Sequence, residues 1–342
     1  MILKQNVGID LSMEKFDVNI SVIDPTFEKH CLGTSQFENN YEGFLSFIEW
    51  IEKHKDSSFE ESYTIEFTGV YYEQLAYFLR NQNKIVHMVI PSKSKKYCES
   101  LSIASKTDKL DAQALAWMGL ERKLRTWEPL SNLFLSLRSL TREREELLKE
   151  RTAISNRLHA VDHKASPSKA TIVRYNERLD LINDQIGEIE SEIREMIKSD
   201  EKLNRKVENI NSIPGVALIT IATVVAETNG FASILNQKQL TSYAGYDVKL
   251  RESGKYKGKS KISKQGNTHI RRVLHFPAQT AITYNKPIGV FYERVNAKKV
   301  KKMIAGVAVQ RKLLCLMYTI WKTDRVFDPN YETNKNNYKK VG

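Results

Sequence analysis

The chain has 342 residues and carries 53 Lys and Arg against 41 Asp and Glu, a formal net charge of +12. At about 100–200 residues per domain, this length predicts two or three domains. Hydrophobic residues make up 41% of the chain, an ordinary share for a folded protein, which excludes a disordered chain. The basic balance predicts a polyanionic partner, either nucleic acid or an anionic membrane surface.

Cysteines and apolar runs narrow the class further. Cys31, Cys98 and Cys315 are odd in number and far apart, which excludes a disulfide framework or a paired-cysteine zinc site. This usage favours a reducing, cytoplasmic compartment. The longest mostly apolar run, 213–226, is too short to cross a bilayer and contains a Pro-Gly pair, so we expect no membrane partner.

Residues 1–128 predict an α/β domain. An apolar run over 7–10 precedes a segment from 16 to 22 that alternates apolar and polar residues, as a half-buried strand does. Helices are then expected over 41–54, 72–81 and 110–120, and strands over 63–67 and 85–90. Thr107 or Asp108 is expected to cap the last of these helices.

Residues 129–205 predict a coiled-coil hairpin. Two heptad runs, 133–161 and 172–196, are separated by Ser166-Pro167-Ser168. A repeat of 3.5 residues favours a coiled coil over the alternative, an ordinary helical bundle. Arg144 and Arg151 occupy core-type positions, which suggests a polar contact or a register device. The hairpin would mediate self-association or act as a spacer.

Residues 206–330 predict a mainly helical domain, and 331–342 a polar tail. The turn around Gly215 lies between two apolar segments, like a helix-hairpin-helix element, and can offer backbone N–H groups to a phosphate. A plain packing turn explains it equally well. Further helices are expected over 269–284 and 300–321.

The excess positive charge lies in this last domain. The stretch from Lys249 to Lys312 has 17 Lys and Arg and two acids, so it carries +15 and the remainder −3. Glycines interrupt the lysines, and basic charge on flexible backbone suits phosphate contacts. A solvated lysine-rich surface is the ordinary alternative.

Four carboxylates fall at places where a metal site forms. Asp10 ends the first apolar run, Glu66 lies near the end of a strand, and Asp108 and Asp111 share one face of a helix start. Such an oxygen-rich pocket suits Mg²⁺ and phosphoryl transfer. Each acid alone also has a structural explanation as a turn or cap residue. Their order along the chain matches the ribonuclease-H-like nuclease plan.

The motifs resemble those of the insertion-sequence one-ten family of transposases. The similar segments are Val7–Asp10 (G-I-D), Glu66–Tyr71 (E-x-T-G-x-Y), Lys106–Ala112 (K-T-D-x-x-D-A), Ser212–Val216 (S-I-P-G-[IV]) and Glu252–Leu274 (S-G, then I-S-K-x-G-N, then L-R-R-x-L). They occur in order over about residues 7 to 325. Tyr243–Val248 departs from the family's A-G-L-x-P because the proline is missing.

The resemblance implies a RuvC-like domain in which Asp10, Glu66, Asp108 and Asp111 are catalytic and bind Mg²⁺. It also implies a serine transposase DNA-binding domain over 206–330, in which Ser253 attacks DNA and forms a phosphoserine link. Residues expected to hold nucleic acid are Gly215, Lys255, Lys257, Lys259, Lys261, Lys264, Arg271 and Arg272. From the residues alone, Ser253 is one serine in a basic loop.

The partners that the resemblance implies are donor DNA, target DNA and a guide (bridge) RNA. It further implies a homo-oligomer, a dimer or tetramer in which the acids and the serine meet across protomers. The expected activity is DNA transposition or site-specific recombination. A DNA invertase of the same family is the nearest alternative. A junction-resolving nuclease would use only the acids and leave no phosphoserine, and a non-enzymatic binding protein would cleave nothing.

Overall fold

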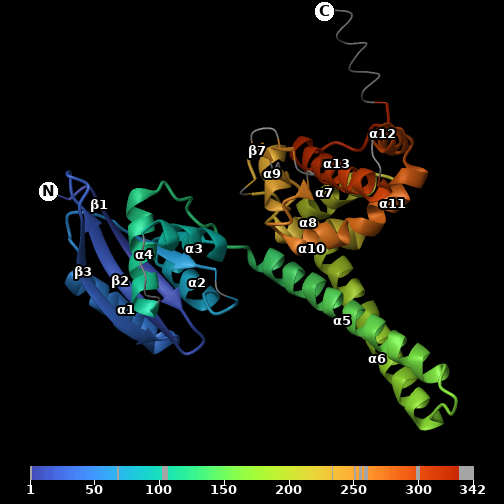
Figure 1. Cartoon of the computed structure of the whole chain (residues 1–342), viewed down its shortest axis with the longest axis horizontal. Helices are drawn as coiled ribbons and strands as arrows, with labels where there is room; N and C mark the ends of the chain where they lie inside the picture. Colours follow the sequence, from blue (N-terminus) through green and yellow to red (C-terminus); the bar gives the residue numbers. More distant parts are fainter. Residues whose placement is uncertain are drawn as a thin grey trace, which may run out of the picture. The chain divides into compact units, whose positions relative to one another are not determined.

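The computed structural model describes residues 2–67, 69–101, 107–232, 234–249, 252–253, 256–257, 261–297 and 301–330. The side chains of 252–253 and 256–257 are not part of that description. The chain divides into two compact units, Met1–Pro129 and Leu130–Gly342 (Figure 1).

The first unit is built on a five-stranded mixed sheet. Its strands are β1 (Lys4–Leu11), β2 (Lys15–Ile23), β3 (Lys29–Glu38), β4 (Glu61–Glu66) and β5 (Ile85–Val89), in the order β3-β2-β1-β4-β5. Strands β1 to β3 pair antiparallel, whereas β4 runs parallel to β1 and β5 parallel to β4. This order and mixture of directions fit the expected ribonuclease-H-like α/β domain.

Helices cover both faces of this sheet (Figure 1). They are α1 (Tyr41–His54), α2 (Glu73–Asn81), α3 (Pro91–Ser100) and α4 (Asp108–Glu121). On one face, Phe47 of α1 meets Phe16 of β2 edge-on, with ring centroids 5.4 Å apart. On the other face, α4 packs over β1 and β2. Because side chains alternate along a strand, Asn6, Gly8 and Asp10 face α4.

Strand β2 differs from the half-buried strand predicted for it. Asp17, Asn19 and Ser21, its polar residues, are buried as completely as its apolar ones. The reason is that α4 covers the face on which these polar residues lie. The face between α4 and the sheet is therefore polar but closed, and its groups bond to one another: Asn6 donates to Ser62 Oγ over 2.7 Å.

The second unit begins with two long helices that pack along each other, α5 (Asn132–Asp162) and α6 (Lys169–Ser199) (Figure 1). They meet through an apolar cluster that contains Ile154, Ile182 and Ile186. Arg144 makes the polar contact expected at its core-type position, because its Nε donates to Glu190 Oε1 over 2.7 Å. The segment is thus a helical hairpin, and its coiled-coil character stays a prediction.

The rest of the second unit is helical around one large core. Its helices are α7 (Glu201–Asn211), α8 (Leu218–Glu227), α9 (Gln237–Tyr243), α10 (Thr268–Val273), α11 (His275–Tyr284), α12 (Lys286–Asn296) and α13 (Lys302–Thr323). Short antiparallel strands also occur in the described residues of this unit. Strand β6 (Val248–Lys249) pairs with β9 (Lys261–Ile262), and β7 (Glu252–Ser253) pairs with β8 (Tyr256–Lys257). The helix expected over 269–284 is divided at Leu274, which caps α10.

Helix α13 is long and apolar enough to cross a membrane by length and composition alone. Leu313, Leu314 and Met317 on this helix are fully buried in the core of the second unit. Packing against neighbouring helices therefore accounts for its apolar character.

Candidate active site

Two of the predicted carboxylates lie at the carboxyl ends of neighbouring parallel strands. Ile9 of β1 is in register with Ile65 of β4, so the next residues, Asp10 and Glu66, stand side by side. Both have the parity of the residues that face α4, and both are partly buried. The sheet therefore presents two acids to one helix.

The other two carboxylates come from the start of that helix. A Cβ on Gly8 would lie 2.0 Å from the carbonyl oxygen of Ala112 and 2.2 Å from the Ala116 nitrogen, so only glycine allows α4 this close. Farther along the helix, Gly119 lies against the Asn6 side chain. Helix α4 thus runs opposite to β1 and points its first turn toward Asp10.

The first turn of α4 is fixed by its cap. Thr107 accepts a hydrogen bond from the Leu110 backbone nitrogen over 3.3 Å, as one of the two predicted caps. This leaves Asp108 and Asp111 in the first turn, where carboxylates are favoured by the helix dipole. Asp108 is exposed and Asp111 is partly buried.

The electrostatics of Asp10 report how these acids act on one another. Burial, together with the negative charges of Asp111, Glu66 and Asp108, raises the pKa of Asp10 to about 7. Like charges disfavour ionisation in this way, and a divalent cation would reverse it. The donors are carboxylate oxygens, which hard cations such as Mg²⁺ prefer. The donor set therefore fits a metal of this class.

Two residues beside these acids were not predicted. Asp17 is directly opposite Asp10 across β1 and β2, and it accepts a hydrogen bond of 2.8 Å from Gln36 Nε2. Ser94 of α3 donates to Glu66 Oε2 and so fixes that carboxylate. Asp17 could have been found from the sequence, because it is a polar residue in a predicted alternating strand. Ser94 could not, because it lies in α3, a polar helix that the sequence did not predict.

A more compact group of possible ligands lies elsewhere in the same unit. Asp24, Glu28 and His30, at the turn between β2 and β3, have ligand atoms within 4.8 Å of one another. It is the one group of this compactness among the residues that the structure describes. Asp24 is already used within the turn, where hydrogen bonds from Thr26 and His30 lower its pKa. The predicted acids are more widely spaced than this group.

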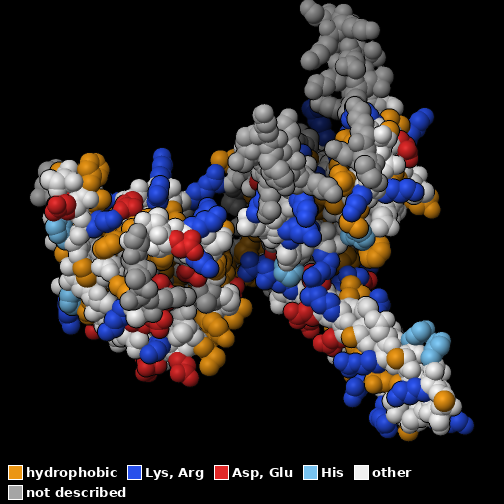
Figure 2. Space-filling model, in the orientation of Figure 1, with side chains coloured by type: hydrophobic (Ala, Val, Ile, Leu, Met, Phe, Trp, Pro, Cys, Tyr) orange, Lys and Arg blue, Asp and Glu red, His pale blue; other side chains and the backbone are white. Residues whose placement is uncertain are grey.

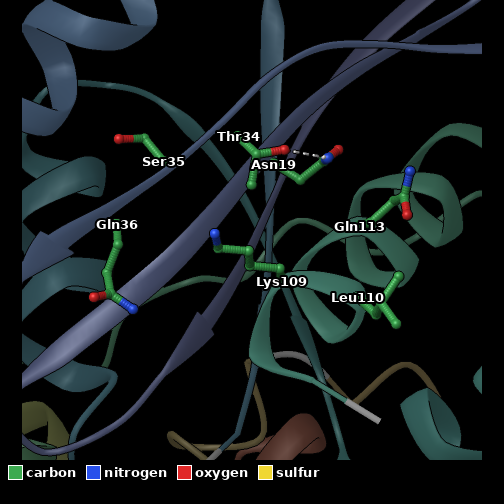
Figure 3. A pocket seen from close by; sticks show the side chains of 7 residues that line it. All are labelled: Asn19, Thr34, Ser35, Gln36, Lys109, Leu110 and Gln113. Carbon is green, nitrogen blue, oxygen red and sulfur yellow. Dashed lines mark hydrogen bonds between the residues drawn. The ribbon is translucent and has the colours of Figure 1, made fainter. Parts of the chain in front are cut away.

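A polar cavity of about 320 Å³ lies between α4 and the strands β2 and β3 (Figure 3). It is lined by Asn19, Thr34, Ser35, Gln36, Lys109, Leu110 and Gln113. Lys109 reaches into it from the first turn of α4, between Asp108 and Asp111 (Figure 3). Asn19 donates to Thr34 Oγ1 over 3.2 Å and holds the opposite wall.

The predicted nucleophile lies in the second unit. The backbone of Ser253 belongs to β7 and pairs with Tyr256 of β8. The side chains of Ser253 and Lys257 are outside the description, as are Lys255 and Lys259 altogether. Lys261 in β9 and Lys264 are exposed.

Arg271 and Arg272 make contacts within the protein. Arg271 Nη1 donates to the carbonyl oxygens of Ala244, Gly266 and Asn267 over 2.7, 3.2 and 3.1 Å. These bonds join the two ends of the chain segment between Ala244 and Gly266, which contains Ser253 and is called the Ser253 segment below. Arg272 contacts Glu145 of α5 and keeps about half of its side chain exposed.

The turn at Gly215 is packed. Gly215 has φ +94°, and a Cβ there would lie 2.6 Å from the Ala281 nitrogen of α11. The close approach explains why glycine stands at this position. Its phosphate contact stays a prediction.

Basic side chains gather on the second unit. Figure 2 shows Lys and Arg interspersed with Asp and Glu along the hairpin of α5 and α6, and mainly Lys and Arg on the helices that follow it. Acidic and basic side chains are mixed on the first unit (Figure 2). On this face, the helices that follow the hairpin are thus the part best suited to phosphate contacts.

Comparison with known proteins gives matches along most of the chain. Residues 7–167 match a family model described as a transposase, and residues 207–293 match one described as transposase, IS116/IS110/IS902 family. A pilin gene-inverting protein of Moraxella bovis is 30% identical over 332 residues, which cover 95% of this chain and 98% of that protein. A transposase for insertion sequence element IS1111A of Coxiella burnetii is 24% identical over 226 residues, 58% of this chain and 60% of that protein.

Among solved structures, T. thermophilus RuvC in complex with a Holliday junction substrate aligns with a TM-score of 0.25 and 12% identity. The alignment covers 33% of this chain and 90% of RuvC. The assignment of the fold rests on the sheet order itself.

Proposed function

The chain belongs to the IS116/IS110/IS902 family of transposases and is a DNA-recombining enzyme, and we propose that its two units supply different halves of the chemistry. The first unit would hold a divalent metal and the second would supply the nucleophile. The observation that carries the first half is geometric: Asp10 and Glu66 end neighbouring parallel strands, and the close crossing at Gly8 points the acidic first turn of α4 toward them. The raised pKa of Asp10, caused by burial and by these neighbouring carboxylates, agrees with this arrangement.

The metal ligands in this proposal are Asp10, Glu66, Asp108 and Asp111, with Mg²⁺ as the ion. A bound dication would neutralise charge that develops on the scissile phosphate. The chain's own part is to hold the acids in place. Ser94 orients Glu66, and Gly8 lets the first turn of α4 approach the sheet.

The nucleophile in this proposal is Ser253. Its Oγ forms a bond to phosphorus while the bridging P–O bond of the DNA strand breaks. The serine gives up its proton and the departing DNA oxygen takes one up, so the protonation balance is unchanged. Attack by a second DNA hydroxyl then releases the serine, which conserves the phosphodiester and needs no nucleotide hydrolysis.

The test is recombination of a supercoiled donor by purified protein with Mg²⁺ and the element's own RNA, followed by denaturing electrophoresis for a covalent protein–DNA adduct. Ser253→Ala should form no adduct, whereas Ser260→Ala, in the same basic stretch, should form it normally. Full activity of Ser253→Ala would exclude this nucleophile. Cleavage without any adduct would instead favour a nuclease that uses only the acids.

The proposed partners are donor and target DNA, a guide RNA and further copies of this chain, with action in the cytoplasm. The family resemblance supports the guide RNA and a dimer or tetramer. The exposed Lys261 and Lys264 would contact nucleic-acid backbone, together with Lys255, Lys257 and Lys259, whose side chains lie outside the described residues. Sequencing of RNA that co-purifies with the protein tests the guide, and loss of activity after ribonuclease treatment should accompany its removal.

A second candidate, site-specific DNA inversion, is favoured by one observation. Two relatives that the chain matches over 98% of their length are pilin gene-inverting proteins. A plasmid that carries a segment between inverted sites distinguishes the two: an invertase flips the segment, and a transposase excises or moves it.

A further inference from the structure

Glu227 is an acidic residue of the second unit, far along the chain from the predicted metal ligands. The sequence predicted no role for it. It is the last residue of α8, and its side chain is 1% exposed. A buried carboxylate is costly unless its environment compensates it. The hydrogen-bond partners of Glu227 therefore indicate its structural role.

One partner comes from the long hairpin. Arg142 of α5 donates to both carboxylate oxygens of Glu227, through Nε over 2.7 Å and Nη2 over 3.0 Å. This two-point geometry fixes the direction of the carboxylate as well as its position. It ties α8 to the helix that begins the hairpin.

The other partners come from the base of the segment that contains Ser253. Asn267 Nδ2 donates to Glu227 Oε2 over 2.6 Å, and the Tyr243 hydroxyl donates to the Glu227 carbonyl over 2.8 Å. Asn267 and Tyr243 also bond to each other through the backbone, over 2.8 Å. Both ends of the segment thus meet at one acid.

Next to these contacts, the two ends of the Ser253 segment lie in close contact. Gly245 and Gly266 both have positive φ, and a Cβ on Gly266 would lie 2.4 Å from the Tyr243 carbonyl oxygen. The Lys264 nitrogen donates to the Gly245 carbonyl over 3.1 Å, and β6 pairs with β9 immediately beyond. The closed base therefore transmits the orientation of its anchor to the strands that follow.

We propose that Glu227 is a positioning residue, which fixes the base of the Ser253 segment against α5 so that the hairpin sets the direction of the nucleophile. The inference rests on the proposed role of Ser253. The anchoring by Glu227 can, however, be tested separately, because hydrogen exchange measures it without any DNA reaction.

The experiment compares Glu227→Gln with Glu190→Gln by hydrogen exchange and by adduct formation in the full chain. Glu190→Gln is the matched control, because it weakens another Arg–Glu pair made by α5, the one between Arg144 and Glu190 of α6. In Glu227→Gln, the Asn267 and Lys264 amides should exchange at least about tenfold faster, since a charged hydrogen-bond acceptor is lost. Adduct formation should slow about tenfold while DNA affinity stays within about twofold. The control should change neither exchange nor adduct rate.

A second variant guards against misfolding of the first. Asn267 caps α10 by accepting from the Ile270 nitrogen over 3.0 Å, and serine is also a good cap. Asn267→Ser keeps the cap but cannot reach Glu227, so it should loosen the same amides in a folded protein.

Unchanged exchange in folded Glu227→Gln and Asn267→Ser would overturn the anchor. Faster exchange with an unaltered adduct rate would overturn the role of that anchor in positioning the nucleophile. If Ser253→Ala formed adducts as fast as the unmodified chain, the nucleophile assignment would fail. The exchange data would still decide whether Glu227 anchors the loop.

Discussion

The two units treat their buried acids in opposite ways. Around Asp10, burial and other carboxylates raise the pKa to about 7. Around Glu227, burial acts in the same direction, but hydrogen bonds and charge from Arg142, with Asn267, outweigh it and lower the pKa. An acid that the chain neutralises with its own donors holds structure. An acid set among other acids is one whose charge a bound cation would compensate, as the proposed metal site requires.

The largest expected effect comes from removing the acids of the first unit. Asp10→Asn combined with Asp108→Asn should lower metal-dependent strand cleavage by about a thousandfold, because the charges that would hold the ion are lost. Cleavage of a supercoiled plasmid at several Mg²⁺ concentrations measures this.

The matched control for that variant is Asp24→Asn. Asp24 belongs to the compact group with Glu28 and His30 in the same unit. Cleavage should stay within about twofold of normal in this control, which retains the four proposed ligands. The reverse pattern would move the metal site to the β2–β3 turn.

Breaking the compensated acid should cost stability. Arg142→Met leaves the carboxylate of Glu227 buried without its main counter-charge, a loss of about 3–5 kcal/mol in the free energy of unfolding. Urea unfolding followed by far-ultraviolet circular dichroism measures it, since the second unit is mainly helical. Arg144→Met should cost under about 1 kcal/mol, because its partner Glu190 is one-third exposed.

The same pair gives a pH dependence with a definite sign. The pKa of Glu227 is lowered in the folded protein, so the pair stabilises above the unfolded pKa of about 4.3. This stability is lost as the pH falls through the folded pKa. The difference between Arg142→Met and the unmodified chain should be full at pH 7 and shrink below about pH 4. A difference that grows in acid would contradict the assignment.

The uncompensated acid should behave in the opposite way. The pKa of Asp10 is raised to about 7, so its charge destabilises the folded first unit increasingly between its unfolded pKa and pH 7. Asp10→Asn should therefore stabilise the metal-free protein by about 1–2 kcal/mol at pH 8, with allowance for solvent screening. The gain should disappear near pH 4. Mg²⁺ should raise the melting temperature of the unmodified chain but hardly that of the variant.

Local signals predicted the elements that carry strong patterns. Helix α1 has the predicted bounds, and its Asn40 cap accepts from the Gly43 nitrogen. Strand β3 was missed because it is an exposed edge strand with few apolar residues. Helix α3 was missed because it is almost entirely polar. Helix α12 was overlooked although Ile288, Phe291 and Val295 stand at helical spacing.

The candidate site was predictable where it depends on local spacing. The i, i+3 pair of Asp108 and Asp111 falls in the first turn of α4 as its spacing indicates. That Asp10 and Glu66 face this turn depends on how α4 crosses the sheet at Gly8, which no local pattern encodes. The Arg142–Glu227 pair joins residues 85 apart in sequence, so only the folded chain brings it to light.

The smallest expected effect concerns the one lysine that lies between the acids. Lys109 is exposed, lines the polar cavity and stands beside Asp108 in the first turn of α4. If a nucleic-acid strand passes the acids, this ammonium group is placed to offset the repulsion between phosphate and carboxylates. Lys109→Ala should then reduce the salt dependence of DNA binding by about one unit in the log–log slope, without loss of stability. Lys123→Ala, an exposed lysine just after α4, should leave the slope unchanged. Equal slopes in both variants would mean that the strand does not cross this cavity, and the acids would then have to be approached from the side of Glu66 and α3.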